Sequence, residues 1–312
     1  MPSPHDRKVF ADLSAFGPTQ DPLMALKLSI GTPVVTMDPS AHAEWEETAS
    51  IEDVAMIAEA ADRLGYHHLT CSEHIGLPAT ELARRGSRYW DPLATFGYLA
   101  ARTSRIRFTT LVLVLGYHHP LDIAKRYGTL DKVSNGRLIL GVGVGTLREE
   151  FDLIGAPFDK RGARADDALR ALRASLSQPQ PAYHGEFYDF EGFVIDPCAV
   201  QKRVPLWVGG RSLRSLRRAA TLADGWCPFA VTPARAAEWL QTVEVADGFE
   251  VVLPPTARLD PIEEPSRTQE ILAETEPCGA TTVSCSFRHR SIGEYLEKIE
   301  ALSTVHAAMG MP

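Results

Sequence analysis

The chain has 312 residues, enough for one large α/β barrel domain or two smaller domains, and enough to bury a core without disulfides or a structural metal. It carries 32 Lys and Arg against 40 Asp and Glu, a formal net charge of -8, which argues against a nucleic-acid binder because such proteins need a basic surface. Hydrophobic residues at 45% and charged residues at 23% are ordinary for a globular protein and exclude wholesale disorder.

The residue pattern predicts no membrane-spanning segment and no secretion signal. The longest stretch without Asp, Glu, Lys or Arg is 108–121, which is too short to span a bilayer, and the first ten residues show no apolar leader core. The five cysteines are odd in number and never spaced CxxC, which favours a reduced protein over a disulfide scaffold or a zinc site. We therefore expect a cytoplasmic protein with no membrane partner.

The first half of the chain alternates strands and helices. Residues 1–25 are rich in proline and glycine without a period, and we expect an N-terminal arm there. After it, the residue patterns predict strands over 26–30, 67–73, 106–115 and 137–145, and helices over 50–64, 91–102 and 120–136.

In the second half of the chain, strands and helices continue to alternate after one insertion. A helix is predicted over 164–176, and the interleaved aromatic and turn residues of 183–193 predict a β-hairpin inside an insertion at about 179–204. Strands then follow over 205–210, 224–229, 249–253 and 280–287, with helices over 212–222, 233–242, 266–274 and 292–302. Eight such units favour a single α/β domain over 26–312, a (β/α)8 TIM barrel, rather than an open doubly wound sheet.

The first candidate for chemistry is the pair Glu73 and His74, at the end of the second predicted strand. Catalytic residues of such barrels lie at the C-terminal ends of the strands, and an imidazole exchanges protons near neutral pH. The alternative is a loop histidine bonded to the backbone. A metal site is not expected, because no HExxH sequence occurs and the first strand carries no HxH.

Two glycine-rich loops are further candidates. Gly141 to Gly145 (GVGVG) would let a ligand approach the backbone of the fourth strand, although the spacing is not GxGxxG and a tight turn would look the same. Gly209, Gly210, Arg211 and Ser212 precede a predicted helix, where free N–H groups and a positive charge can bind an anion. A simple capped helix is the alternative.

Taken together, several phrases in a fixed order resemble the luciferase-like monooxygenase superfamily and its deazaflavin-dependent branch. They are EH at 73–74, HPLDIAKRYGTLDKVSNGRLILGVGVG at 119–145, REEFDLIGAPFDKRG at 148–162, YHGEFYDFEG at 183–192, PLWVGGRS at 205–212 and ADGW at 223–226. The resemblance covers about residues 26–230. It implies a barrel with an insertion, a homodimer, and FMN or coenzyme F420 bound at the C-terminal ends of the strands.

The resemblance also assigns residues. His74 corresponds to a histidine near the reactive ring, and Thr110–Leu111 to the place of a non-prolyl cis peptide behind that ring. Gly143 and Gly145 correspond to cofactor contacts, and Gly209 and Gly210 to the phosphate loop. Val144 departs from the arginine that holds the FMN phosphate in bacterial luciferase. Thr146 departs from the glutamate proton donor of the F420-dependent sugar-phosphate dehydrogenases.

These observations predict a coenzyme F420-dependent oxidoreductase that transfers a hydride to or from a small organic substrate. His74 is the expected acid or base with Glu73 orienting it, Thr110, Leu111 and 143–146 line the cofactor, and 209–212 hold its phosphate. The alternatives are an FMN monooxygenase that uses reduced flavin and O2, and a phosphate-binding barrel lyase or isomerase. A homodimer is expected through apolar residues of the two helices after strands two and three, Leu93, Phe96, Leu99, Ile123 and Leu130.

Overall fold

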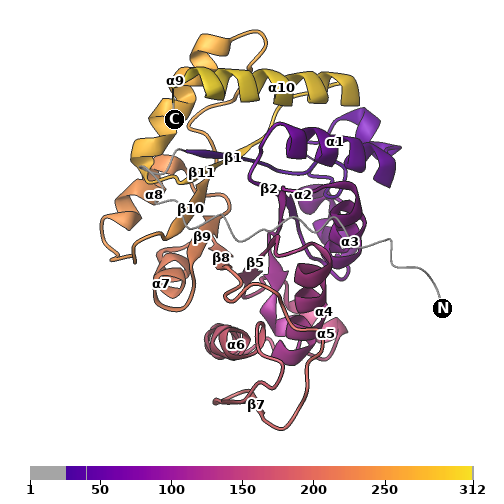
Figure 1. Cartoon of the computed structure of the whole chain (residues 1–312), viewed down its shortest axis with the longest axis vertical. Helices are drawn as coiled ribbons and strands as arrows, with labels where there is room; N and C mark the ends of the chain where they lie inside the picture. The colour runs from indigo at the N-terminus through magenta and orange to yellow at the C-terminus, as the bar shows by residue number, and fades with distance from the viewer. Residues whose placement is uncertain (1–25, 40, 311–312) are drawn as a thin grey trace, which may run out of the picture.

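Eight parallel strands close into a barrel in the computed structural model, which describes residues 26–39 and 41–310 (Figure 1). The barrel strands are β1 (Lys27–Ile30), β2 (His68–Cys71), β3 (Arg107–Thr110), β5 (Leu138–Gly143), β8 (Leu206–Gly210), β9 (Gly225–Pro228), β10 (Glu250–Leu253) and β11 (Thr282–Cys285). They neighbour one another in that order, and β1 pairs with β11, with Lys27 opposite Thr282. The eight-stranded α/β barrel expected from the sequence is confirmed.

Helices cover the outside of the barrel (Figure 1). The long ones are α1 (Ile51–Arg63), α3 (Pro92–Arg102), α4 (Pro120–Val133), α6 (Arg161–Ser175), α7 (Leu213–Leu222), α8 (Pro233–Leu240), α9 (Pro265–Thr275) and α10 (Ile292–Ala308). Short helices are η1 (Glu44–Glu47), η2 (Ala79–Glu81), α2 (Leu82–Arg85), η3 (Leu115–Tyr117), α5 (Arg148–Leu153) and η4 (Glu276–Cys278). The start of α3 follows from its sequence, because the Asp91 carboxylate accepts the N–H of Ala94 and Pro92 needs no donor at the first turn.

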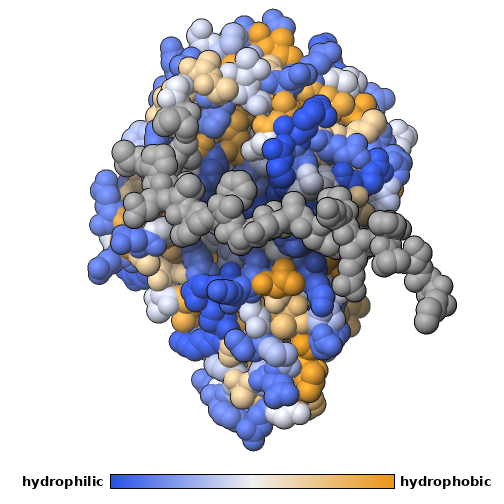
Figure 2. All heavy atoms as spheres, viewed as in Figure 1, coloured by the Kyte–Doolittle hydropathy of each residue, from blue (hydrophilic) through white to orange (hydrophobic). Residues whose placement is uncertain are grey.

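The core has two layers. A large apolar cluster fills the space between strands and helices, while Ile139, Trp207, Cys227 and Val252 form a small cluster inside the barrel. All six residues of β5 are buried, as expected for a strand with packing on both faces. Figure 2 shows that hydrophilic residues make up most of the visible outer face, with hydrophobic residues in small groups.

The third barrel strand is interrupted. After β3 ends at Thr110, the peptide bond between Leu111 and Val112 is cis, and the chain resumes pairing as β4 (Leu113–Val114) beside β5. The cis bond therefore lies one residue beyond the Thr110–Leu111 position that the family resemblance implied. The Ser72 hydroxyl donates to the Leu111 carbonyl at 2.7 Å, so the end of β2 supports this bulge.

The insertion between α6 and β8 contains the expected hairpin. Strands β6 (Tyr183–His184) and β7 (Asp189–Phe190) are antiparallel and lie at the opposite end of the molecule from α10 (Figure 1). The Asp167 carboxylate on α6 accepts the N–H groups of Phe187 and Tyr188 at 2.7 and 3.1 Å. One buried carboxylate thus joins the hairpin to the barrel wall.

The apolar residues that suggested a dimer interface pack against the core of this chain. Phe96, Leu99, Ile123 and Leu130 are at most 2% exposed, and Leu93 packs half-buried against the same core. The prediction that these residues form a dimer interface is therefore wrong. The homodimer itself stays a prediction, because these residues no longer support it. The expected N-terminal arm, residues 1–25, lies outside the described residues. Within the described part of the chain, the helices are all too short or too polar to cross a membrane.

Candidate active site

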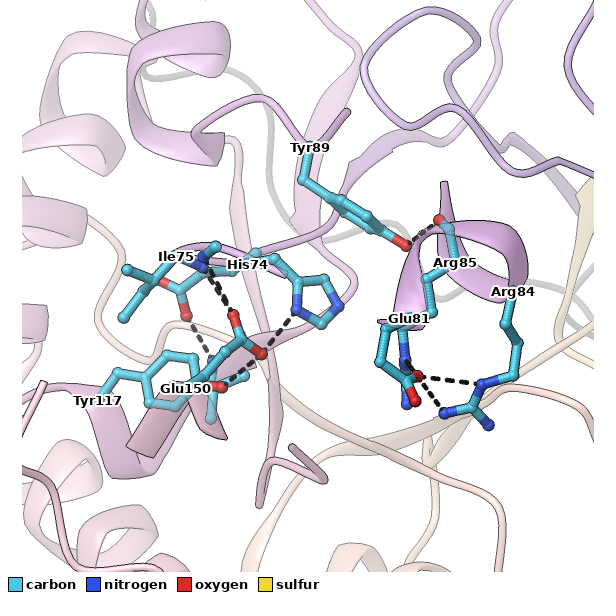
Figure 3. A network of polar contacts seen from close by, with 11 residues as sticks. His74, Ile75, Glu81, Arg84, Arg85, Tyr89, Tyr117 and Glu150 are labelled. Carbon is cyan, nitrogen blue, oxygen red and sulfur yellow. Dashed lines mark hydrogen bonds and ion pairs between the residues drawn. The ribbon is translucent and has the colours of Figure 1, made fainter. Parts of the chain in front are cut away.

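His74 lies just beyond the end of β2, at the mouth of the barrel, and its ring contacts the carboxylate of Glu150 (Figure 3). Glu150 is on α5, the short helix that follows β5. Its Oε2 atom lies 2.8 Å from Nδ1 of His74. The carboxylate accepts a hydrogen bond from the N–H at Nδ1, which leaves Nε2 as the ring nitrogen available for a ligand. Within the described residues, no hydrogen bond is made by this Nε2.

Glu150 is buried, with 1% of its surface exposed, yet it is fully hydrogen-bonded. Besides His74, it accepts the Ile75 N–H at 2.9 Å and the Tyr117 hydroxyl at 2.9 Å. Burial alone would raise the pKa of Glu150, but the bonds from His74, Tyr117 and Ile75 outweigh it and lower that pKa. The carboxylate is therefore negative at neutral pH and can stabilise a positive charge on His74.

Two tyrosines hold this pair in place. Burial and the adjacent Glu150 charge raise the pKa of Tyr117, so its hydroxyl remains a donor. The ring of Tyr89 meets the His74 ring edge-on, with centroids 4.4 Å apart, and its hydroxyl donates to the Arg85 carbonyl at 2.8 Å. Figure 3 shows the imidazole between Glu150 and Tyr89. The His74 side chain keeps 16% of its surface exposed, which is enough to meet a substrate.

Glu73 has a different task from the one the sequence suggested. Its Oε1 lies 2.7 Å from Nε2 of His118, and its Oε2 accepts the N–H of Val114 at 2.7 Å. The prediction that Glu73 orients His74 is wrong: Glu150 does so, while Glu73 supports the bulge between β3 and β4. Successive residues of an extended segment point to opposite sides, which explains why neighbours in sequence serve different partners.

The strand glycines approach protein rather than open space. A Cβ on Gly143 would lie 2.6 Å from Cγ2 of Val112, and one on Gly209 would lie 2.5 Å from its Cγ1. Val112, at the cis peptide, therefore packs between β5 and β8 and explains both glycines. Thr110 is fully buried and its hydroxyl donates to the Gly141 carbonyl at 2.7 Å, so it is a structural residue, whereas Leu111 is half-buried beside the bulge.

The loop after β5 receives an arginine that the sequence analysis missed. Val144 is half-buried, Thr146 is exposed, and Gly145 has a φ of +77°, which favours glycine. The Nε of Arg161, at the start of α6, donates to the Gly145 carbonyl at 3.2 Å, and its guanidinium lies 3.9 Å above the Phe158 ring. A positive charge thus stands beside Gly145 although the loop itself carries none.

The loop after β8 has the features of an anion site. Ser212 is the N-cap of α7, and its exposed side chain makes no capping bond. Arg211 and Arg214 are exposed, and among the described residues no ion pair is formed by either. Gly210 has a φ of +138° and a Cβ there would lie 2.7 Å from Cβ of Ser215, so a bulky residue would disturb the loop itself. These donors fit a phosphate group.

Sequence reasoning missed Glu150 because the phrase REEF offers two adjacent glutamates on a short helix. Glu149 is exposed and Glu150 is buried, and only the helix position separates them. The signal that could have identified Glu150 is its place directly after a barrel strand, at the end where barrels carry their chemistry.

A closed parallel barrel with a histidine–carboxylate pair just beyond the C-terminal end of β2 has the arrangement that is typical of TIM-barrel enzymes. A family model described as luciferase-like monooxygenase matches residues 32–251, and the chain belongs to this family. Its members are oxidoreductases or monooxygenases, so the chain belongs to a family of enzymes, and the barrel lyase or isomerase considered from the sequence stays an alternative.

The similar proteins cover different lengths of the chain. An uncharacterized protein of Mycobacterium tuberculosis is 33% identical over 182 residues. The match covers 54% of this chain and only 62% of the length of that relative. A second protein of the same organism is 30% identical over 264 residues, covering 80% of this chain and 92% of the relative.

Solved structures share the fold. The coenzyme F420-dependent tetrahydromethanopterin reductase of Methanopyrus kandleri has a TM-score of 0.68 at 14% identity, covering 91% of this chain and 99% of the reductase. The oxygenating constituent of 3,6-diketocamphane monooxygenase from Pseudomonas putida, in complex with FMN, has a TM-score of 0.69 at 14% identity, with 91% and 99% covered.

Proposed function

We propose that the chain is a coenzyme F420-dependent oxidoreductase that transfers a hydride to or from a small organic substrate. The observation that carries the proposal is the His74–Glu150 pair at the barrel mouth, with Nε2 of His74 free. The unpaired donors of Arg211, Ser212 and Arg214 fit the phosphate that such a cofactor carries. When bound, the deazaflavin ring would supply the hydride chemistry, because it lacks the ring nitrogen that makes flavins react with oxygen.

The residues of the chain supply the proton. A substrate carbonyl that is reduced gains negative charge on its oxygen, and Nε2 of protonated His74 can donate a proton to it; in the reverse direction neutral Nε2 accepts the hydroxyl proton. The buried Glu150 carboxylate stabilises the imidazolium through Nδ1 in either direction. Tyr117 and the N–H of Ile75 keep that carboxylate charged and fixed.

The choice of F420 over FMN rests on Val144, which stands where bacterial luciferase has its phosphate arginine. Similarity to the F420-dependent reductase from Methanopyrus kandleri is consistent with this choice. An FMN monooxygenase is the second candidate, because Arg161 brings a guanidinium to Gly145 from α6 and could replace the missing arginine. The FMN complex of the related Pseudomonas putida monooxygenase fits this second reading.

Titration with both cofactors, oxidised and reduced, tests the proposal. We expect coenzyme F420 to bind more tightly than FMN, as measured by calorimetry or by quenching of cofactor fluorescence. Submicromolar binding of FMN with no detectable binding of F420 would overturn the F420 assignment and leave the monooxygenase. Arg161→Ala adds a sharper control: it should weaken FMN binding if Arg161 holds the flavin phosphate, and change F420 affinity little if the loop after β8 holds the phosphate.

A further inference from the structure

A hollow opens at the C-terminal ends of β1, β10 and β11. None of the candidate site residues from the sequence analysis lies in this part of the barrel mouth. The hollow has a volume of about 390 Å³, within the usual range for small-molecule sites. In the closed order of strands, β1 lies opposite β8, with three strands between them on either side. The hollow is therefore separate from the proposed phosphate loop. Its walls include Thr36, Arg258, Phe287, Arg288, His289 and Tyr295.

The hollow adjoins His74 through a short backbone bridge. Thr36 in its wall pairs with Tyr89 in an antiparallel bridge, and the N–H of Trp90 donates to the Val35 carbonyl at 2.9 Å. Tyr89 is the residue whose ring contacts His74. Tyr89 therefore connects the wall of the hollow with the proposed acid–base group.

Two arginines of the hollow form no ion pair with any described residue. Arg258 and Arg288 are both exposed, and within the described part of the chain each lacks an ion pair and a side-chain hydrogen bond. Nearby arginines differ, since Arg267 on α9 pairs with Glu270 and Glu274, and Arg290 pairs with Glu294. Two guanidinium groups without partners beside one cavity indicate an acidic ligand.

The lining also contains two carboxylates, Asp38 and Glu46, and among the described residues neither forms an ion pair with Arg258 or Arg288. Glu46 is 2% exposed, and its oxygens accept the N–H groups of Val34 and Ala43 at 2.7 and 2.8 Å. The indole of Trp45 donates to Nδ1 of His289 at 2.9 Å, so the proton of the neutral imidazole is on Nε2, which lies 3.6 Å from Oε1 of Glu46. The Glu46 carboxylate therefore already has its hydrogen-bond partners within the protein.

A buried hydroxyl in the wall is without a partner. Tyr295 on α10 is 1% exposed, and its hydroxyl makes no hydrogen bond to any described residue. Its ring packs against His289, with centroids 4.9 Å apart, and against Phe287 at 5.9 Å. An unpaired buried donor is costly unless a ligand or water satisfies it. This hydroxyl is a further donor for an acceptor group in the hollow.

We propose that this hollow binds the carboxylate end of a small organic acid, the substrate of the His74 centre. The guanidinium groups of Arg258 and Arg288 pair with the carboxylate, the Tyr295 hydroxyl donates to a ligand oxygen, and Phe287 contacts the apolar part. The proposal deepens the proposed function by naming the class of substrate, and it rests on that function only for the reaction, because binding of the acid requires no cofactor.

The test compares benzoate with benzamide, which have the same shape and differ in charge. Calorimetry on the full-length protein without cofactor should show saturable binding of benzoate and at least tenfold weaker binding of benzamide. Arg258→Ala and Arg288→Ala should each weaken benzoate binding about tenfold, the range of a charge-assisted hydrogen bond. Arg290→Ala, next to the hollow but paired with Glu294, is the matched control and should bind like the parent.

Tyr295→Phe separates a ligand contact from a structural role. Removal of an unsatisfied buried hydroxyl should leave the melting temperature unchanged or raised, and a ligand contact predicts several-fold weaker benzoate binding in the same preparation. Equal affinity for benzoate and benzamide, or benzoate binding unchanged in both arginine variants, would overturn the proposal. Binding of benzoate without binding of F420 would reject the cofactor assignment alone, and the reverse result would reject this site alone.

Discussion

Nε2 of His74 is the atom on which the proposed chemistry depends, and the surrounding residues determine its state. Glu150 accepts a hydrogen bond from the N–H at Nδ1, and Tyr89 packs against the ring, so the imidazole is fixed in both tautomer and direction. A histidine fixed in this way resembles the base of a catalytic dyad, because its rotation is restricted before any substrate arrives. The two variants that follow test separate parts of this arrangement.

His74→Ala should lower turnover by about 10²–10⁴-fold, the usual range for a lost general acid or base, while cofactor affinity changes little. The reason is that the proposed phosphate donors lie after β8, on another part of the mouth. Turnover and thermal stability should be measured on the same preparation once a substrate is found. A fully folded variant with turnover near that of the parent would reject a catalytic role for His74.

Glu150→Gln should lower turnover by about 10–100-fold, because the amide can still accept the Ile75 N–H but cannot stabilise an imidazolium through charge. Glu149→Gln is the control on the same turn of α5, where the side chain is exposed. If both variants lose activity equally, the loss does not come from the His74 contact.

At the scale of elements, the bulge between β3 and β4 determines the shape of the barrel mouth. Glu73 and Ser72 hold it from the end of β2, and the Val112 side chain packs against glycines of β5 and β8. Three strands therefore meet around one valine. A larger residue at either glycine has no room unless Val112 moves.

Gly143→Ala and Gly209→Ala should each destabilise the protein by about 1–3 kcal/mol, the usual cost of overpacking a core. Each added methyl would lie 2.5–2.6 Å from a Val112 methyl. Val112→Ala should recover part of the loss when combined with either substitution, and urea unfolding of the four proteins in each double-mutant cycle measures this coupling. Strictly additive losses would show that the collision with Val112 is not the cause.

The elements were more predictable than the contacts between them. All eight barrel strands were placed from short apolar runs, several of which end at glycine or proline, and the caps at Asp91 and Pro92 marked the start of α3 within a residue. The pairing of His74 with Glu150 joins residues 76 positions apart, and no local pattern records it. The glycines of β5 were predicted as positions where a ligand approaches the backbone closely, but a sequence does not say that Val112 is what approaches.

At the scale of the whole molecule, the two ends of the barrel have different electrostatics. The N-terminal end contains His67 and His68, whose Nδ1 atoms lie 2.9 Å apart beside the ring of Trp207. Burial, followed by the charges of Lys27 and Arg107, lowers the pKa of His67 to about 4. Both histidines are therefore neutral in the folded protein at neutral pH.

Stability should fall as the pH drops from about 6.5 to about 4. His67 takes up a proton in the unfolded chain over this interval but not in the folded one, so the unfolded state binds more protons and stability rises with pH. This group alone accounts for about 2 kcal/mol between pH 7.5 and pH 5. His67→Gln should reduce that difference in urea unfolding, whereas His184→Gln should not, because the pKa of His184 is raised by Asp189. An unchanged slope in His67→Gln would contradict this assignment.

Because β1 pairs with β11, the barrel can close only after its last strand has been synthesised. The Ser29 hydroxyl donates to the Val283 carbonyl, a bond between residues 254 positions apart. Until Thr282–Cys285 leaves the ribosome, β1 and β10 each have an unpaired edge, which can recruit strands of other chains. These edges stay open in a nascent chain for almost the entire time of translation, and shortening the chain before Thr282 should produce aggregates rather than a smaller barrel.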